Sequence, residues 1–533
     1  MKEPARLEAT EAELTALTQR LKERSLKPED YELLNAVIDT VCFLSHAVQR
    51  KTTSIQRLLR MIFGASTEKT AMVLKRDCVR RPSSDAPLCR LKRKGHGRRA
   101  AETYWGAKTV AVPHEQFKAA DACPDCTQGK LYDTGRPAVL LHLHAQPVIA
   151  GTRFELEKLR CALCGKLFSA TAPAEAGEEK YNANVASMLA VMRYGYGMPM
   201  NRLAQLQQDF GVPLPAGTQW ELLHAHAQEL EPVFEELVHQ AAGADLFHND
   251  DTTARILALE KQIREAEVLV AGATKQRTGI FTTGIIARCK HRTLALFFSG
   301  GQHAGENLQD VLDHRPPDLP PPIQMCDGLS RNKPSRTITN MANCNSHGRR
   351  GFVTVAEAFP EECAHVLETM QQVYKHEKQT RREAMSDEQR LLFHQQHSGP
   401  LMDNLKWWME QKLAAKQVEP NGSLGEAITY VLKRWQPLTL FLRQPGAPLD
   451  NNICEQMLKT SIRHRNNSLF YKTEHGAHVG DLFMSFIHTC RLVRADPFDY
   501  LTTLRRFIRR VRDDPSAWMP WNYQATVTAL PRI

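Results

Sequence analysis

Three acidic residues stand where carboxylates could hold metal ions: Asp250, Asp327 and Glu455. Asp250 and Asp327 each end a short apolar stretch with a strand pattern, and Glu455 lies in the second turn of a predicted helix. Three converging carboxylates can bind two Mg²⁺ ions about 3.5–4 Å apart, the arrangement for in-line attack on a phosphodiester. Residue order alone does not single out these three, because the chain has 59 acids and Asp251 would point to the opposite face from Asp250.

Four of the 13 cysteines form two C-x-x-C pairs, separated by strand-like stretches. Two such pairs on a hairpin can supply four thiolates to a tetrahedral structural zinc ion, and chance pairing or a redox motif is the alternative. The odd cysteine total indicates a reducing compartment. No signal-peptide core and no run of about 18 apolar residues is present, so we expect no membrane span. The predicted zinc ligands are Cys123, Cys126, Cys161 and Cys164.

Basic residues are concentrated in two segments of the chain. The formal charge is only +10, from 69 basic and 59 acidic residues, but residues 75–99 and 504–512 are strongly basic. Focused positive charge suits a polyanion, most simply DNA, and a solvated linker is the alternative. The candidate DNA contacts in the first segment are Lys92, Arg93, Lys94, Arg98 and Arg99.

The elements that must position these residues indicate several domains. Apolar residues recur every seven positions from Leu34 to Ile62, as in a coiled coil or an amphipathic helix packed within the monomer. Residues 200–210 and the helix from Thr218 suggest a helix-turn-helix, or an ordinary helical pair. The predicted regions are 1–64 helical and oligomerising, 65–118 basic linker, 119–172 zinc ribbon, 180–240 helix-turn-helix-like, 243–352 catalytic core, 353–440 helical insertion, 441–490 last core helix and 491–533 C-terminal.

From Ala244 the pattern changes from helices to strands. Strands are predicted at 244–252, 253–260, 278–289, 292–300 and 323–328, with a helix at 304–315 before the last one and a further short strand within 341–352. Helices follow to about Arg434, and 449–465 forms one more, with Asp450 as its N-cap. This order indicates a multidomain α+β protein with an RNase H-like mixed α/β core and a helical insertion.

Several motifs in this order resemble the DDE transposases of the insertion sequence 66 family. "HNDDT" resembles the first-aspartate motif and favours Asp250 over Asp251, "CDG" gives Asp327, and "LDNNICEQ" gives Glu455. "CNSHGRRGF" and "RNNSLF" resemble two further motifs of the family. Gln456 and Asn466 depart from the Arg and Lys usual there, and Ser468 from the frequent Trp, which puts details of DNA contact in doubt.

The resemblance implies a bacterial, cytoplasmic, nucleoid-associated enzyme. It would bind the inverted repeats of its element, cut one strand with two Mg²⁺ (or Mn²⁺) ions and join the 3′-hydroxyl to target DNA. A homo-oligomer is expected, and a need for small accessory transposition proteins stays open. A catalytically silent DNA-binding protein and another RNase H-like nuclease are the alternatives. The candidate phosphate contacts are His347, Arg349, Arg350, Arg463 and Arg465, each with a structural role as the alternative, and Asn451 and Asn452 either contact DNA or hold the helix start.

Overall fold

The computed structural model describes most of the chain from residue 179 onward and parts of the rest. The chain divides into two units, Met1–Asp77 with Ile149–Ile533, and Cys78–Val148. The predicted zinc cysteines, the basic residues at 92–99 and most of the heptad pattern lie outside the described residues. The described residues are 11–23, 25–38, 70–74, 119–121, 130, 148–160, 167–171, 173–174, 179–269, 278–290 and 292–531.

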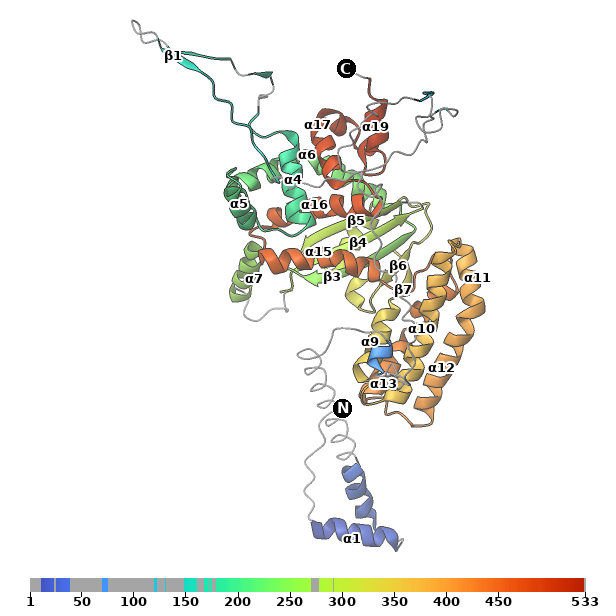
Figure 1. The fold of residues 1–533 in the computed structure, drawn as a ribbon. Helices are drawn as coiled ribbons and strands as arrows, with labels where there is room; N and C mark the ends of the chain where they lie inside the picture. Colours follow the sequence, from blue (N-terminus) through green and yellow to red (C-terminus); the bar gives the residue numbers. More distant parts are fainter. Residues whose placement is uncertain are drawn as a thin grey trace, which may run out of the picture. The chain divides into compact units, whose positions relative to one another are not determined.

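A five-stranded mixed sheet forms the centre of the described fold (Figure 1). Its strand order is β5-β4-β3-β6-β7. Strands β3, β4 and β5 pair antiparallel, and β6 and β7 run parallel to β3. Apart from residues 253–260, the apolar stretches predicted as strands therefore belong to one continuous sheet. The strands are β3 Leu246–Thr253, β4 Phe281–Cys289, β5 Arg292–Gly300, β6 Ile323–Cys326 and β7 Asn340–Asn343.

Helices before and after the sheet share one apolar core with it. Leu230 on α6, Phe297 on β5, Phe483 on α16 and Tyr500 on α17 are all buried in this cluster. Segments far apart in the sequence therefore fold as one packed body. The helices are α4 Ala183–Ala190, the π-helix η3 Val191–Gly195, α5 Met200–Asp209, α6 Ala216–Ala242, α7 Leu257–Leu269, α8 Ala304–Leu312, α15 Asn452–Ser468, α16 Glu474–Leu492, α17 Pro497–Arg506, α18 Ile508–Asp513, η6 Pro515–Trp518 and α19 Tyr523–Ala529.

A group of helices between β7 and α15 has an apolar core of its own, which also includes residues of β6 and β7. Phe352, Leu367, Leu405 and Ile428 are buried in it. The helices predicted between Val353 and Arg434 are therefore confirmed, and they pack around a common core (Figure 1, yellow to orange). Its elements, with the short η4 that follows β6, are η4 Ser330–Asn332, α9 Asn345–Val355, α10 Pro360–Arg382, α11 Asp387–His397, α12 Gly399–Ala414, α13 Ser423–Lys433, α14 Trp435–Leu438 and η5 Leu440–Leu442.

The free edge of β5 is covered by polar side chains of α16. Asp481 Oδ2, Ser485 Oγ and Thr489 Oγ1 accept hydrogen bonds from the backbone N–H groups of Ser299, Phe297 and Ala295, at 2.7, 2.9 and 3.0 Å. The helix places an acceptor every four residues and the strand edge a donor every two, so the two spacings match. An unpaired edge would otherwise be a site for aggregation.

The N-terminal elements are short where the structure describes them. They are α1 Glu11–Lys22, a helical stretch at residues 28–38, α3 Thr70–Val73, and a two-stranded hairpin of β1 Lys158–Arg160 and β2 Leu167–Ser169. The break predicted at Pro28 is present between the first two helices. None of the described helices is both long and apolar enough to cross a membrane.

Three local predictions were wrong. Residues 253–260 were predicted as a strand, but only Thr253 belongs to one, and α7 begins at Leu257. This segment contains two Ala, two Leu and a Glu, which favour a helix. Asp250 does not end its strand, because β3 continues to Thr253. The N-cap of α15 is Asn451, so Glu455 lies in the first turn rather than the second.

Candidate active site

Asp250 faces the helix α15 from the middle of the sheet. It lies on the same side of β3 as His248, because alternate residues of a strand share a face. Its antiparallel partner on β4 is Gly284. A side chain at Gly284 would lie within 2.6 Å of Met457 Cε and 2.9 Å of Leu458 Cδ2 on α15. The missing side chain therefore lets α15 pack directly over the strand position opposite Asp250.

Asp251 points to the other face of β3, where its charge is balanced. One carboxylate oxygen lies 3.2 Å from His303 Nδ1, and the other accepts a hydrogen bond from the Arg331 guanidinium at 3.2 Å. The side chain is 2% exposed. The ambiguity between the two adjacent aspartates is thus removed geometrically, since Asp250 alone faces α15.

Asp327 follows β6, the parallel neighbour of β3, and a short loop fixes its carboxylate. Oδ1 accepts hydrogen bonds from the Asn332 side-chain amide and from the backbone N–H of Leu329, the latter at 3.2 Å. The Asn332 carbonyl accepts from Asn249 Nδ2 at 2.8 Å and Gln324 Nε2 at 2.7 Å. Two strands therefore hold the loop that orients Asp327.

Glu455 is positioned by the start of α15, which Asn451 ties to β3. Asn451 Nδ2 donates to the carbonyl of Asn249 at 3.1 Å, and its Oδ1 lies 3.1 Å from His248 Nδ1. The Asn451 backbone N–H donates to Cys344 Sγ at 3.3 Å. Asn451 is 0% exposed. A buried side chain cannot reach a DNA backbone, so we assign Asn451 a structural role.

Asp450, the predicted N-cap of α15, makes a hydrogen bond at the start of the helix. Asp450 Oδ1 accepts from the backbone N–H of Asn452 at 3.1 Å, although the N-cap position belongs to Asn451. Burial raises the pKa of Asp450, and the neighbouring amide and guanidinium groups oppose that rise. Asp450 therefore stabilises the helix start, as an acidic side chain there is expected to do.

The three carboxylates are close enough to influence one another electrostatically. Burial, and then the charge of Asp327, raise the pKa of Asp250 to about 7, against the hydrogen bond from the Asp251 backbone, and the charges of Asp251 and Glu455 add to the rise. Among the described residues, none of the three forms a salt bridge with a lysine or arginine. Unbalanced negative charge of this kind is what a bound divalent cation would neutralise.

Glu455 also belongs to a second group of potential ligands. In the described part of the chain, one set of three side chains brings its ligand atoms within 4.8 Å of one another, and it consists of Cys344, His347 and Glu455. His347 Nδ1 lies 3.8 Å from Glu455 Oε1. Glu455 therefore lies beside the Cys–His pair at the start of α9 and also acts electrostatically on Asp250.

The candidate DNA contacts differ in their surroundings. Arg350 and Arg463 are exposed, as is Asn452. Arg349 donates to the Thr70 hydroxyl at 3.3 Å. Arg465 donates to the Thr253 hydroxyl at 2.7 Å and so braces the end of β3. Among these arginines, Arg465 has a clear structural role in addition to its charge.

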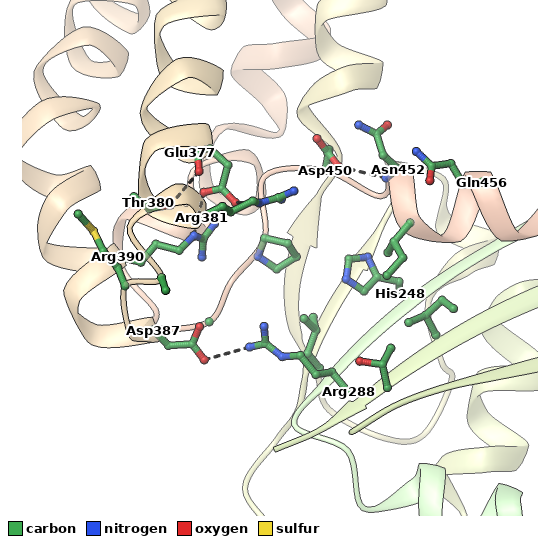
Figure 2. Close-up of a pocket in the computed structure, with 18 residues that line it drawn as sticks. His248, Arg288, Glu377, Thr380, Arg381, Asp387, Arg390, Asp450, Asn452 and Gln456 are labelled. Atoms are coloured by element: carbon green, nitrogen blue, oxygen red, sulfur yellow. Dashed lines mark hydrogen bonds and ion pairs between the residues drawn. The ribbon is translucent and has the colours of Figure 1, made fainter. Parts of the chain in front are cut away.

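A pocket of about 610 Å³ lies beside the start of α15, between the sheet and helices α10 and α11 (Figure 2). Arg288 forms an ion pair with Asp387 at 3.0 Å. Arg381 and Arg390 both bind Glu377, at 2.8 Å. Each arginine of the pocket is thus paired with a carboxylate that also lines it. The pocket therefore contains ion pairs within and between the sheet and helices α10 and α11. Because the charges of its arginines are balanced, it is not a basic site for DNA.

Sequence reasoning missed the residues that support the carboxylates. Asn249 and Asn332 orient the Asp327 loop, and Asn451 fixes α15, yet the sequence analysis gave Asn249, inside "HNDDT", and Asn332 no role. Their partners are distant in the chain, so only the fold reveals these contacts. The two adjacent asparagines, Asn451 and Asn452, stood out in the sequence, but the sequence did not decide between DNA contact and a role at the helix start.

Comparison with known proteins identifies one family. The model of the family described as "Transposase IS66 family" matches residues 179–479, more than half of the chain. Similar curated proteins include the uncharacterized proteins y4hP, y4jD and y4qI of Sinorhizobium fredii, at 24, 26 and 24% identity. The matches cover 70, 64 and 63% of this chain and 68, 66 and 61% of those proteins. No solved structure matches significantly.

Proposed function

Because the chain belongs to the IS66 transposase family, we propose that it is a DNA transposase with a DDE mechanism. It binds the terminal inverted repeats of its element, cleaves one strand to expose a 3′-hydroxyl and transfers that hydroxyl to target DNA. The observation that carries this proposal is that Asp327 and Glu455, from two other elements, lie close enough to Asp250 for their charges to contribute to its raised pKa. Carboxylates arranged in this way suit metal-dependent phosphoryl transfer.

The sheet supports an RNase H-like core. Three antiparallel strands are followed by two parallel ones, and the first strand, β3, lies in the middle. Asp250 lies on β3 and Asp327 directly follows β6, the parallel neighbour of β3, and α15 packs over the face of β3 that carries Asp250. A helical insertion between the last strand and the last catalytic helix fits the same architecture.

Asp250, Asp327 and Glu455 would hold the two Mg²⁺ ions. Carboxylate oxygens are the ligands that this hard cation prefers, and the cluster has a surplus of negative charge. When bound, the ions supply activation of the nucleophile and stabilisation of the leaving oxygen. The chain itself keeps Asp327 oriented through Asn332 and keeps Asp251 out of the site through Arg331 and His303.

Basic residues and a zinc ribbon would provide DNA binding. Arg350, Arg463 and Asn452 are exposed and suited to phosphate contact, and Arg349, Arg465 and His347 lie on the same two helices. The hairpin of β1 and β2 flanks the pair Cys161 and Cys164, which supports a zinc ion held with Cys123 and Cys126. The basic run at 92–99, which lies outside the described residues, is proposed on its sequence alone as a further DNA contact.

The test is strand transfer of labelled element-end oligonucleotides into plasmid DNA. Wild-type protein should nick and join with Mg²⁺ and not without it. Asp250→Asn, Asp327→Asn and Glu455→Gln should each lower joining by at least about 10³-fold, because each removes a ligand from a two-metal site. End binding, measured by fluorescence anisotropy, should stay within about twofold, because the basic residues are kept.

Two outcomes would overturn the proposal. Normal end binding by wild type without any nicking or joining would indicate a catalytically silent DNA-binding protein. Cleavage of branched DNA without preference for the element ends would indicate a different RNase H-like nuclease. Asp251→Asn is the matched control, since it changes the adjacent carboxylate on the opposite face of β3.

A further inference from the structure

Two helix starts are fixed against each other at the edge of the active site. The backbone N–H and the side-chain amide of Asn345 both donate to the Leu449 carbonyl at 3.1 Å. The Asn451 backbone N–H donates to Cys344 Sγ at 3.3 Å. These bonds hold the first turn of α9 beside the first turn of α15. Cys344 and His347, three residues apart, are therefore preorganised next to Glu455.

Two polar atoms beside these helix starts lack a hydrogen-bond partner among the described residues. His347 Nδ1 and Glu455 Oε1 are both buried and make no hydrogen bond to any described residue. They lie 3.8 Å apart. A buried polar atom without a partner costs free energy, so such a pair calls for an explanation, commonly an ion or water. Cys344 adds a sulfur ligand that lies within 4.8 Å of a ring nitrogen of His347 and of a carboxylate oxygen of Glu455.

We propose that Cys344 Sγ, His347 Nδ1 and the Glu455 carboxylate form a binding site for one Zn²⁺ ion. A sulfur, an imidazole nitrogen and a carboxylate oxygen form a ligand set that favours zinc over Mg²⁺. Ligands of a tetrahedral zinc ion with bonds of about 2.0–2.3 Å lie roughly 3.5 Å apart, so small side-chain rotations complete the geometry. Three protein ligands leave a fourth position for water.

Zinc at this site would inhibit the enzyme. Glu455 is shared with the proposed Mg²⁺ site, so an ion held by Cys344 and His347 takes Glu455 away from the aspartates. Hard Mg²⁺ competes poorly for a site with a thiolate, and zinc inhibition should therefore persist in millimolar Mg²⁺. The binding site stands on the geometry alone, whereas its inhibitory effect rests on the proposed function.

Metal binding is tested with Co²⁺ as a spectroscopic probe on the full-length protein. Wild type should bind one more equivalent of Co²⁺ than Cys344→Ser, with a stronger thiolate-to-cobalt absorption. His347→Gln should lose the same equivalent. Cys363→Ser, which alters another buried thiol on α10, is the control and should match wild type. Any cobalt at the predicted zinc ribbon contributes equally to all four proteins.

Equal cobalt stoichiometry in wild type, Cys344→Ser and His347→Gln would overturn the site. Circular dichroism of each variant checks that it is folded. If either Cys344→Ser or His347→Gln does not fold, the other variant still tests the site. Inhibition is then measured as the Zn²⁺ concentration that halves each protein's own Mg²⁺-dependent joining. This concentration should rise at least tenfold in Cys344→Ser. An unchanged value would overturn the inhibition, and cobalt binding without any joining by wild type would contradict the proposed function alone.

Discussion

Asp250 is a proposed metal ligand, and its ionised carboxylate destabilises the folded protein when no cation is bound. Its pKa is raised from 3.8 to about 7 by burial and by the neighbouring carboxylates. The unfolded chain therefore releases this proton near pH 4, whereas the folded chain retains it until about pH 7. The folded state binds more protons in between, so this group destabilises the protein increasingly as pH rises through that range. Above pH 7 the full cost is present unless a cation binds.

Asp250→Asn should therefore stabilise the Mg²⁺-free protein while abolishing joining. The gain at pH 8 should be on the order of 2 kcal/mol, since one pKa unit corresponds to about 1.4 kcal/mol and partial exposure reduces the effect. At pH 5 the gain should be smaller, because the wild-type carboxyl keeps its proton there. Urea unfolding at both pH values measures it. An equal or larger gain at pH 5 would contradict the assigned titration.

Protons should also compete with Mg²⁺ for Asp250. Metal binding requires the ionised carboxylate, so below about pH 7 each ion must displace a proton. The Mg²⁺ concentration for half-maximal joining should rise several-fold from pH 8 to pH 6. End binding measured without Mg²⁺ at the same two pH values is the control. A Mg²⁺ requirement independent of pH would show that Asp250 is already ionised at pH 6.

At the scale of elements, the loop after β6 depends on a close approach by α8. A side chain at Gly305 would overlap the Lys333 carbonyl and come within 2.7 Å of the Arg331 carbonyl, both backbone atoms. Gly305→Ala should displace this loop and with it Asn332, which holds Asp327. We expect joining to fall at least tenfold with end binding kept. Gly217→Ala, on α6 with open space around it, is the matched control.

The helix α16 should contribute to stability through the β5 edge. The Thr489 hydroxyl accepts from the Ala295 N–H and donates to the Ala295 carbonyl. Thr489→Val keeps the shape but leaves both backbone groups buried without partners, which costs about 1–3 kcal/mol. Chemical denaturation measures the destabilisation. Thr489→Ser, which keeps the hydroxyl, should retain most of the stability, and equal destabilisation in both variants would point to the methyl group instead.

Sequence patterns predicted elements better than their contacts. Short runs rich in apolar and β-branched residues correctly predicted β3, β4, β5 and β6, because these strands are buried over several consecutive residues. The same reasoning failed at 253–260, where Ile256, Leu257 and Leu259 fit either period. Asn249 and Asn332 lie 83 positions apart, and Asn249 and Asn451 lie 202 apart. No local pattern encodes such pairings, so the support of the site had to come from the structure.

At the scale of the whole described body, the C-terminal helices are part of the core rather than an appendage. Tyr500, Trp518 and Tyr523 are buried in the same cluster as the sheet and α6. The Tyr500 hydroxyl donates to the Trp518 carbonyl at 3.1 Å. Truncation of such a side chain to Ala typically costs about 3–5 kcal/mol. The segment from α17 to α19 therefore helps to hold together elements from both ends of the catalytic region.

The other face of this segment is basic and should act on DNA instead of on stability. Arg506, Arg509, Arg510 and Arg512 are exposed. Removing one cation that neutralises a phosphate reduces the steepness of log affinity against log salt by about 0.9 on duplex DNA. Arg509→Gln combined with Arg510→Gln should thus weaken DNA binding at low salt and flatten its salt dependence, with the unfolding midpoint unchanged. Tyr500→Ala is the opposite control, because it should lower the midpoint. An unaltered salt slope in the double variant would show that Arg509 and Arg510 do not contact DNA phosphates and are only solvent-exposed.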